Sequence, residues 1–377
     1  MKTDGLSQLP NGRWAQRLPF LATSPPQILA YIVERGLSLT KRGRMPTNAD
    51  VLVIAMLRNR YPTDPVLPLV MELRKLTKVI GTYANWPLGE DGRVHTEFTL
   101  KPESGRLSSV RPNVQNVPQP EDEDDMYAQF RRVIVASPGH KLGSIDYKGI
   151  EAVLTGYFAG DDEYMELATK GVHAYATARR SGMSVSPKTF TSELAEQVKR
   201  EQPSLYKKLK KTNHGINYGE GWRKLFKINP GLFSSEADAK ELWEFIRSEI
   251  PKVIEWQDRT VKQAFTKHRL TNPYRYQRWF WDPTADGPAA IAQQPQSTAA
   301  AIIRAAMLRV DADPITSESL VWQIHDELIF DAPEGVFDGM MRRAVEIMEE
   351  PVAELGGLVI RTSSKCGPNL ADMEDWG

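Results

Sequence analysis

The chain has 377 residues, of which 41% are hydrophobic and 25% are charged, a balance typical of a globular protein with room for more than one subdomain. The formal net charge is zero, which argues weakly against a nucleic-acid-binding protein, although acids and bases are clustered along the chain. The single cysteine, Cys366, excludes an internal disulfide, and the longest apolar run, residues 51–57, is too short to span a bilayer, so we expect a cytoplasmic protein with no membrane anchor.

The N-terminal region contains the first expected helices. A helical stretch lies near residues 28–34, and Asn48 and Asp50 can cap a helix that begins at Val51. After Asp64, leucines at positions 69, 73 and 76 have the spacing of a further helix. Its other faces carry Arg74, Lys75 and Lys78.

The next part of the chain predicts strands and loops. Residues 84–120 are rich in glycine, proline, asparagine and serine, and the acidic run of residues 121–125 favours a solvated turn. Residues 130–136 and 141–147 indicate two short strands, separated by a turn at residues 138–139.

Helical patterns dominate residues 151–270. A helix is expected to begin near Ser235, with Asp238 three residues later as in a capping box, and Pro251 starts another helix. A further helix is expected over residues 298–310. Two apolar runs that flank His325 and Asp326 then predict a hairpin with a polar tip, so the fold class is α+β.

Acidic side chains stand where the expected strands end. Asp146 closes one strand, and Asp326 and Glu327 lie at the hairpin tip. A carboxylate in such a position is tolerated when it is solvated, paired or bound to a metal, and Mg²⁺ favours one or two carboxylates with water and substrate phosphates. The spacing leaves two interpretations open: a metal site, or ordinary turn acids and a capping aspartate.

Residues 206–218 predict a helix with a cationic and aromatic face. This face and its flanks carry Tyr206, Lys207, Lys210, His214, Asn217 and Tyr218. Lysine suits phosphate and an aromatic ring suits a base or sugar, so a nucleoside triphosphate would fit; a solvated lysine-rich helix is the alternative. Gly215 and Gly219 favour a close approach by another body, because each glycine weakens a helix by about 1 kcal/mol.

A polar loop at residues 104–109 is followed by three amide side chains. Arg106 and the amides of Asn113, Gln115 and Asn116 could donate to the minor-groove acceptors that all base pairs share. A loop whose polar groups bond to one another is an equally good interpretation.

Five segments resemble, in chain order, the motifs of the family A DNA polymerases, the DNA polymerase I-like enzymes. They are residues 105–109 (GRLSS) with 112–118 (PNVQNVP), 144–151 (SIDYKGIE, motif A), 210–219 (KKTNHGINYG, motif B), 295–300 (PQSTAA) and 323–328 (QIHDEL, motif C). The resemblance extends over roughly residues 45–377. Each segment alone is weak, whereas five in the right order are specific.

The resemblance implies a right-hand polymerase fold, with an antiparallel palm sheet, a large helical fingers insertion and a helical thumb. The implied divisions are a shortened thumb and the start of the palm at 1–100, palm with motif A at 101–155, fingers with motif B at 156–290, and palm with motif C at 291–377. The implied activity is addition of deoxynucleoside triphosphates to a primer on a DNA template, with two Mg²⁺ ions, which Mn²⁺ can replace. No proofreading exonuclease is expected in this chain, and a processivity factor is left open.

The resemblance also implies roles for individual residues. The catalytic residues would be Asp146, Asp326, Glu327 and Lys210, and the metal ligands would be Asp146, Tyr147 and Asp326. The nucleotide would be bound by Glu151, as the gate against a 2′-hydroxyl, and by His173, Lys207, Lys210, His214 and Tyr218. The DNA would be bound by Arg74, Lys75, Lys78, Arg106, Asn113, Gln115, Asn116, Gln293, Gln296 and His325.

Four positions depart from the family pattern. Tyr206 replaces an arginine, His214 an aromatic residue, Gly149 a glutamine and Val153 an arginine, which bears on rate and sugar selectivity rather than on the reaction class. Two other functions stay open: a single-subunit RNA polymerase, which shares the two aspartates, and a non-catalytic DNA-binding subunit. Glu151 favours DNA synthesis over RNA synthesis.

Overall fold

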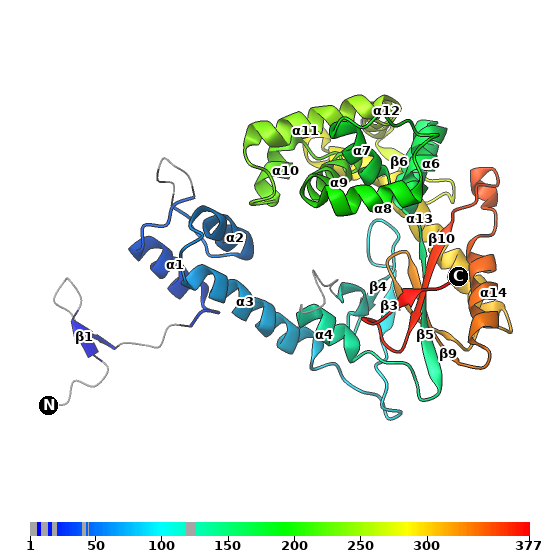
Figure 1. The fold of residues 1–377 in the computed structure, drawn as a ribbon, viewed down its shortest axis with the longest axis horizontal. Helices are drawn as coiled ribbons and strands as arrows, with labels where there is room; N and C mark the ends of the chain where they lie inside the picture. Colours follow the sequence, from blue (N-terminus) through cyan, green and yellow to red (C-terminus); the bar gives the residue numbers. More distant parts are fainter. Residues whose placement is uncertain (1–5, 9–13, 17–20, 40–42, 44, 118–125) are drawn as a thin grey trace. The chain divides into compact units, whose positions relative to one another are not determined.

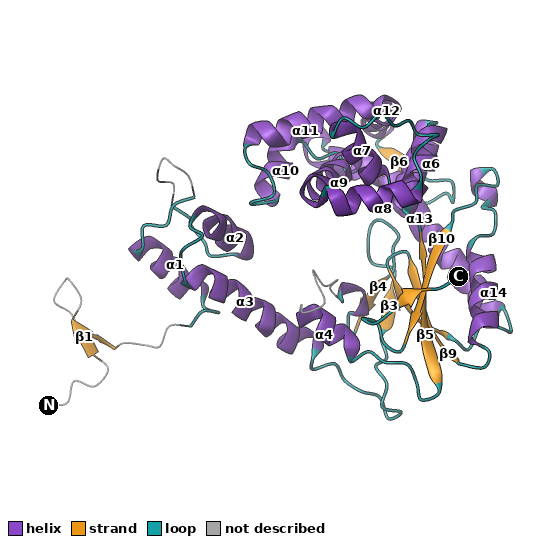
Figure 2. Ribbon diagram, in the orientation of Figure 1, coloured by secondary structure: helices purple, strands orange, loops and turns teal. Residues whose placement is uncertain are grey.

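The computed structural model describes residues 6–8, 14–16, 21–39, 43, 45–117 and 126–377. The acidic run of residues 121–125 therefore lies outside the described residues. The chain forms two compact units, Met1–Thr82 and Tyr83–Gly377, whose elements are drawn in Figures 1 and 2. Among the described residues, no helix has the length and apolar composition needed to cross a membrane.

In the described part of the first unit, the main elements are three α-helices and a short hairpin. Its elements are β1 (Leu6–Gln8), β2 (Trp14–Gln16), α1 (Pro25–Glu34), α2 (Val51–Arg60) and α3 (Val66–Lys78). The expected cap of α2 is confirmed, because the Asp50 carboxylate accepts a hydrogen bond of 2.8 Å from the Val53 amide. The leucines that indicated α3 lie on its exposed side, and Leu67 and Val70 are its buried residues.

The second unit contains a five-stranded antiparallel sheet. Its strand order is β11-β10-β5-β9-β8. The strands are β5 (His140–Tyr147), β8 (Leu320–Ile324), β9 (Glu327–Pro333), β10 (Thr362–Gly367) and β11 (Glu374–Asp375). Alternation along β9 places Leu328 and Phe330 in the main core with helices α13 (Pro283–Ala312) and α14 (Phe337–Met348), whereas Ile329 faces a smaller cluster.

Helices fill the long connection between β5 and β8. They are α5 (Ile150–Ala159), α6 (Asp162–Lys170), α7 (Val172–Arg180), α8 (Ser192–Glu201), α9 (Pro203–Asn217), α10 (Trp222–Ile228), α11 (Glu236–Glu249) and α12 (Pro251–Lys267). Figure 1 shows α6 to α12 gathered in one bundle. The predicted start of α11 is confirmed, since the Ser235 hydroxyl accepts a hydrogen bond from the Asp238 amide at 3.1 Å.

Short elements occupy the remaining segments. They are η1 (Val79–Tyr83), β3 (Glu97–Thr99), β4 (Ser108–Val110), η2 (Val114–Asn116), α4 (Met126–Arg132), β6 (Arg269–Thr271), β7 (Gln277–Trp279) and η3 (Ala353–Leu355). The helix expected over residues 298–310 is present but longer, because it belongs to α13.

The strand expected over residues 130–136 is wrong. The first part of that segment belongs to helix α4, and Val135 makes only an isolated bridge to Asn369. The reason is tertiary: the Phe130 ring lies 5.2 Å from Tyr83 and 5.4 Å from Trp86, measured between ring centroids. This aromatic contact outweighs the β-branched residues that follow.

Candidate active site

The two aspartates that are far apart in the sequence come together at one edge of the sheet. Asp146 is the second-last residue of β5 and is in register with Glu327 on β9, and the Tyr147 amide donates to the carbonyl of Asp326 at 3.3 Å. Asp146, Asp326 and Glu327 line a pocket of about 480 Å³. The strand pairing thus brings the acids into one cluster, as the metal-site interpretation of the sequence requires.

Electrostatics at this edge favour a bound cation. Burial, followed by the charges of Asp326 and Glu327, raises the pKa of Asp146 to about 8. Burial also raises the pKa of Asp326 and of Glu327. Carboxylates held together out of water repel one another unless a cation lies between them, and a hard divalent cation such as Mg²⁺ suits oxygen donors.

Few groups in this pocket can coordinate a metal ion. The Ser144 hydroxyl donates a hydrogen bond to Glu327, and the buried Tyr147 hydroxyl donates to the carbonyl of Met348 at 2.7 Å. Tyr147 therefore offers only its backbone carbonyl to a metal. Within the described ranges, no three histidine, cysteine, aspartate or glutamate side chains are grouped as a metal site. The fit consequently rests on Asp146 and Asp326, with water and substrate oxygens completing the coordination.

The hairpin tip carries a strained residue. His325 has a φ of 58°, in the left-handed region that non-glycine residues rarely adopt. Gln323 donates to the carbonyl of His325 and accepts a hydrogen bond of 2.6 Å from Gln115. Burial lowers the pKa of His325, while Asp326 opposes that shift. The neighbouring amides therefore hold this backbone next to the acids.

Glu151 connects three segments beside the acids. It lies in the first turn of α5, and its carboxylate accepts hydrogen bonds from the Arg106 guanidinium and from the Tyr218 hydroxyl at the end of α9. Burial lowers the pKa of Arg106, and the charge of Asp326 works against that shift. The loop of residues 104–109, α5 and α9 therefore meet at Glu151, close enough to the acidic pocket for Asp326 to act on the charge of Arg106.

Helix α9 presents the expected cations. Lys207, Lys210 and His214 are exposed, and the His214 ring lies 4.6 Å from the Tyr218 ring between centroids. Partial burial of the ring, followed by the charge of Lys211, lowers the pKa of His214, while Glu220 opposes that shift. His173 on α7 is close enough to Lys210 that this charge, after burial, helps to lower its pKa to about 4.

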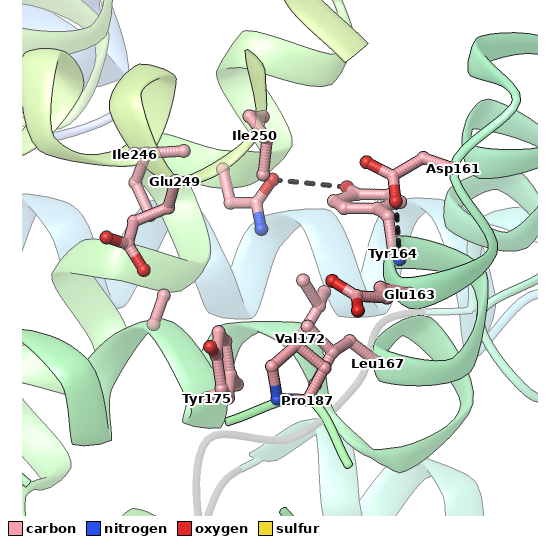
Figure 3. Close-up of a pocket in the computed structure, with 12 residues that line it drawn as sticks. Asp161, Glu163, Tyr164, Leu167, Val172, Tyr175, Pro187, Ile246, Glu249 and Ile250 are labelled. Carbon is pink, nitrogen blue, oxygen red and sulfur yellow. Dashed lines mark hydrogen bonds between the residues drawn. The ribbon is translucent and has the colours of Figure 1, made fainter. Parts of the chain in front are cut away.

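A second pocket lies inside the helical bundle. It has a volume of about 180 Å³, and Figure 3 shows Tyr164, Tyr175 and Glu249 among the side chains around it.

Asn217, expected on the exposed face of α9, instead donates to the Tyr164 hydroxyl at 3.0 Å. This contact fixes α9 against α6 and takes Asn217 out of the candidate site.

Most amides of the polar loop bond within the protein. The Asn113 carbonyl oxygen accepts from the Ser109 hydroxyl at 2.9 Å, and the Gln115 oxygen accepts from the Ser109 amide at 2.9 Å. Asn116, in contrast, is exposed. On α13, Gln293 is buried and Gln296 is half-buried. The Gln293 Oε1 has no hydrogen-bond partner among the residues described.

The three predicted cations of the first unit all lie on α3. Arg74 donates from Nη1 to the carbonyl of Ala49 at 2.7 Å, so part of its guanidinium holds α3 within the unit. Lys78 is exposed and Lys75 is half-buried. Of the three, Lys78 is therefore the most exposed to solvent, whereas Arg74 is used in part within the unit.

Several residues of the acidic pocket were not predicted from the sequence. Ser144, Arg131 and Lys365 line the acidic pocket. Ser144 precedes Asp146 by two residues, so strand alternation could have placed both on one face. No local signal links Lys365, on β10, to the acids, because their proximity depends on the pairing of Ser363 with Asp146.

One departure from the family pattern has a local explanation. Gly149 precedes α5 with a φ of 57°, and a Cβ there would lie 3.1 Å from the carbonyl oxygen of Ala168. A side chain at this position would strain the backbone and crowd α6, so glycine replaces glutamine here.

Comparisons with known proteins agree with the resemblance. A family model described as DNA polymerase family A matches residues 13–372. DNA polymerase I of Caldicellulosiruptor bescii is 28% identical over 93% of this chain and 40% of its own length. DNA polymerase I of Geobacillus stearothermophilus is 27% identical over 88% and 38%, and the thermostable DNA polymerase I of Thermus aquaticus is 27% identical over 82% and 36%. The chain thus spans about two fifths of the length of these relatives.

A solved structure supports the fold. The POL domain of Pol1 from M. smegmatis, in complex with DNA primer-template and dNTP, matches 93% of this chain and 61% of that chain. The TM-score is 0.75 and the sequence identity is 23%. This match confirms the expected α+β polymerase-domain fold with its antiparallel sheet.

Proposed function

Because the chain belongs to DNA polymerase family A, we propose that it adds deoxynucleoside triphosphates to the 3′-hydroxyl of a primer on a DNA template and releases pyrophosphate. The observation that carries this proposal is the meeting of Asp146 and Asp326 at the end of paired strands, in one pocket. Phosphoryl transfer depends mainly on positioning and on charge neutralisation, which such a pocket can supply.

The carboxylates of Asp146 and Asp326 and the carbonyl of Tyr147 would hold two Mg²⁺ ions, or Mn²⁺ in their place. When bound, such ions activate the attacking hydroxyl and neutralise charge on the leaving pyrophosphate. Glu327, bonded to Ser144, keeps the hairpin tip in register with β5 and adds negative charge nearby.

Exposed cations of α9 support a triphosphate site. Lys210 and Lys207 would attract the phosphates as point charges. The pKa of His173 is lowered to about 4, so its ring is neutral at pH 7 and would donate a hydrogen bond rather than carry charge. The pKa of His214 is lowered as well, which favours the same role for its ring. Tyr218, held by Glu151, would lie beside the templating base.

Glu151 is proposed to select the sugar. Its carboxylate is already bonded to Arg106 and Tyr218, which restricts its movement. A fixed carboxylate beside the nucleotide would crowd a 2′-hydroxyl and favour deoxyribose. Arg106, His325 and Gln296 would then face the primer terminus, with Asn116 as a further donor toward the minor groove.

The test is primer extension by the full chain with Asp326→Asn. Asparagine has nearly the same size but no negative charge, so we expect extension with Mg²⁺ to fall by a factor of about 10² or more, while primer-template affinity stays within a few fold. Asp311→Asn, an exposed acid on α13, is the matched control and should extend normally.

The readouts are single-nucleotide extension rates and the dissociation constant for a labelled primer-template. A melting curve for each variant checks that both fold. Extension by Asp326→Asn within tenfold of the unmutated chain would rule out the assigned metal site. Preferential use of ribonucleotides by the unmutated chain would favour the RNA polymerase alternative.

A further inference from the structure

The hairpin formed by β6 and β7 carries a row of stacked planar side chains, here called the aromatic ladder: His268, Trp281, Trp279 and Arg269. The His268 and Trp281 rings lie 5.2 Å apart at 20°, and the Trp281 and Trp279 rings lie 6.0 Å apart at 6°. The Arg269 guanidinium lies 5.8 Å from the centre of the Trp279 ring. The four groups form one continuous stack along the hairpin.

The ladder faces solvent rather than the core. Trp279 is 53% exposed and Trp281 is 68% exposed. The opposite face of the hairpin supplies its packing, because Leu270 and Phe280 are buried against α12 and α13. Stacking between strands stabilises so short a hairpin, but it does not require two indoles to be left in water. Their exposure therefore points to a partner with flat apolar surfaces.

Exposed cations lie on the hairpin, together with the acids Asp282 and Asp286 that follow Trp281. Lys267, Arg269 and Arg275 are exposed, and none of them forms an ion pair in the part of the chain that the structure describes. Arg278 pairs with Glu103, and the Asp286 carboxylate accepts hydrogen bonds from two backbone amides. The surface thus combines aromatic planes with unpaired cations, which fits a polyanion that carries stackable rings.

The hairpin is attached to the candidate active site. Asn272 donates to the Ser297 hydroxyl on α13 at 3.0 Å, next to Gln296 in the sequence. The Tyr276 hydroxyl donates to the carbonyl of Glu103 at 2.9 Å, in the loop that continues to Arg106. These contacts hold the turn end of the hairpin next to two segments of the candidate site, and the ladder begins at the other end, with the paired residues Arg269 and Trp279.

We propose that the aromatic ladder binds unpaired nucleotides of single-stranded DNA, namely the part of the template that has not yet been copied. His268 and Arg269 cover the two ends of the ladder, so a base stacks on Trp281 or Trp279 by taking the place of one of these end groups. The exposed cations Lys267, Arg269 and Arg275 attract the phosphates. Stacking depends little on base identity, so the site suits a template of any sequence. The assignment of the strand as template rests on the proposed function, whereas the stacking itself does not.

The test compares Trp279→Ala/Trp281→Ala with the unmutated chain by fluorescence anisotropy. Two labelled primer-templates share one duplex and differ in overhang, one nucleotide against fifteen. We expect the variant to bind the long overhang about fivefold more weakly or worse, and the short overhang unchanged. Trp279→Phe/Trp281→Phe keeps two rings and should recover most of the affinity. Trp222→Ala, at a tryptophan on α10 outside the ladder, is the matched control.

The binding assay uses no Mg²⁺ and no nucleotide, so its result is independent of whether the chain extends primers. Raising the salt should weaken every variant together and keep the ratio, because stacking is not ionic. Equal affinities for the long overhang would overturn the proposal and leave the ladder to a protein partner. Equal losses on both overhangs would overturn it as well, because they would show an effect on duplex binding or folding.

Discussion

His173 lies on α7, and its Nδ1 is buried without a hydrogen-bond partner among the residues that the structure describes. Burial comes first, and the positive charge of Lys210 second, in lowering the pKa of this imidazole to about 4. A neutral ring next to a lysine keeps a hydrogen-bond donor without adding repulsion between cations. The family resemblance implied that His173 and Lys210 both contact the nucleotide, but it did not predict the protonation state of His173.

We predict that NMR titration of the six histidines gives His173 a pKa near 4. Lys210→Gln should raise this pKa but leave it below 6.5, because burial is the larger cause. Lys227→Gln, on α10, should leave it unchanged. A pKa of 6.5 or more in the unmutated chain would contradict the inferred environment.

The lowered pKa of His173 also determines the direction in which the free energy of unfolding changes with pH. The unfolded chain binds this proton more readily than the folded chain, so the His173 contribution to the free energy of unfolding is full above about pH 6.5 and is lost as the pH falls toward 4. The loss is at most about 3 kcal/mol.

Gly219 marks the end of α9, where two elements come close. Its φ is 68°, and a Cβ there would lie 2.8 Å from the Ile291 Cδ1 and 3.1 Å from the Pro288 Cα on α13. This is the close approach that the glycines of motif B predicted from the sequence. It fixes the start of the α9–α10 connection against α13, beside the Tyr218 contact to Glu151.

We predict that Gly219→Ala lowers the free energy of unfolding by about 1–3 kcal/mol, because the methyl group meets backbone and the positive φ is strained. Nucleotide affinity should fall with it, since Tyr218 shifts. Gly339→Ala is the control: this helical glycine on α14 has open space around its Cβ position, so alanine should be neutral or stabilising. Denaturant melts of both variants make the comparison, and similar stabilities would contradict the packing argument.

Elements with local signals could be predicted from the sequence. Ser235 identified the start of α11, and the residues flanking His325 and Asp326 identified the hairpin. Elements decided by distant contacts could not, as the helix around Phe130 illustrates. The same division holds for the site: carboxylates at strand ends were visible, but the contact of Arg106 with Glu151 depends on the way the chain folds back on itself.

At the scale of the whole molecule, a formal net charge of zero hides an uneven distribution. The first unit places Lys75 and Lys78 in the last turn of α3, where positive charge also complements the helix dipole. In the second unit, many cations are paired, as Lys208 is with Asp238 at 2.7 Å. Affinity for DNA therefore depends on where the cations lie and not on their sum.

The family resemblance predicts that cations on α3 contact DNA, and the salt dependence of DNA binding tests this prediction. Each phosphate contact contributes about 0.9 to the slope of log affinity against log salt concentration. Lys75→Gln/Lys78→Gln in the full chain should therefore flatten that slope by about 2, whereas Arg74 is left intact because it bonds to Ala49 within the unit. Lys240→Gln/Lys252→Gln, on α11 and α12, makes the same change in charge and should leave the slope unaltered. If the two double variants gave one common slope, the cations of α3 would act only through net charge and the proposed contact with the duplex would fail.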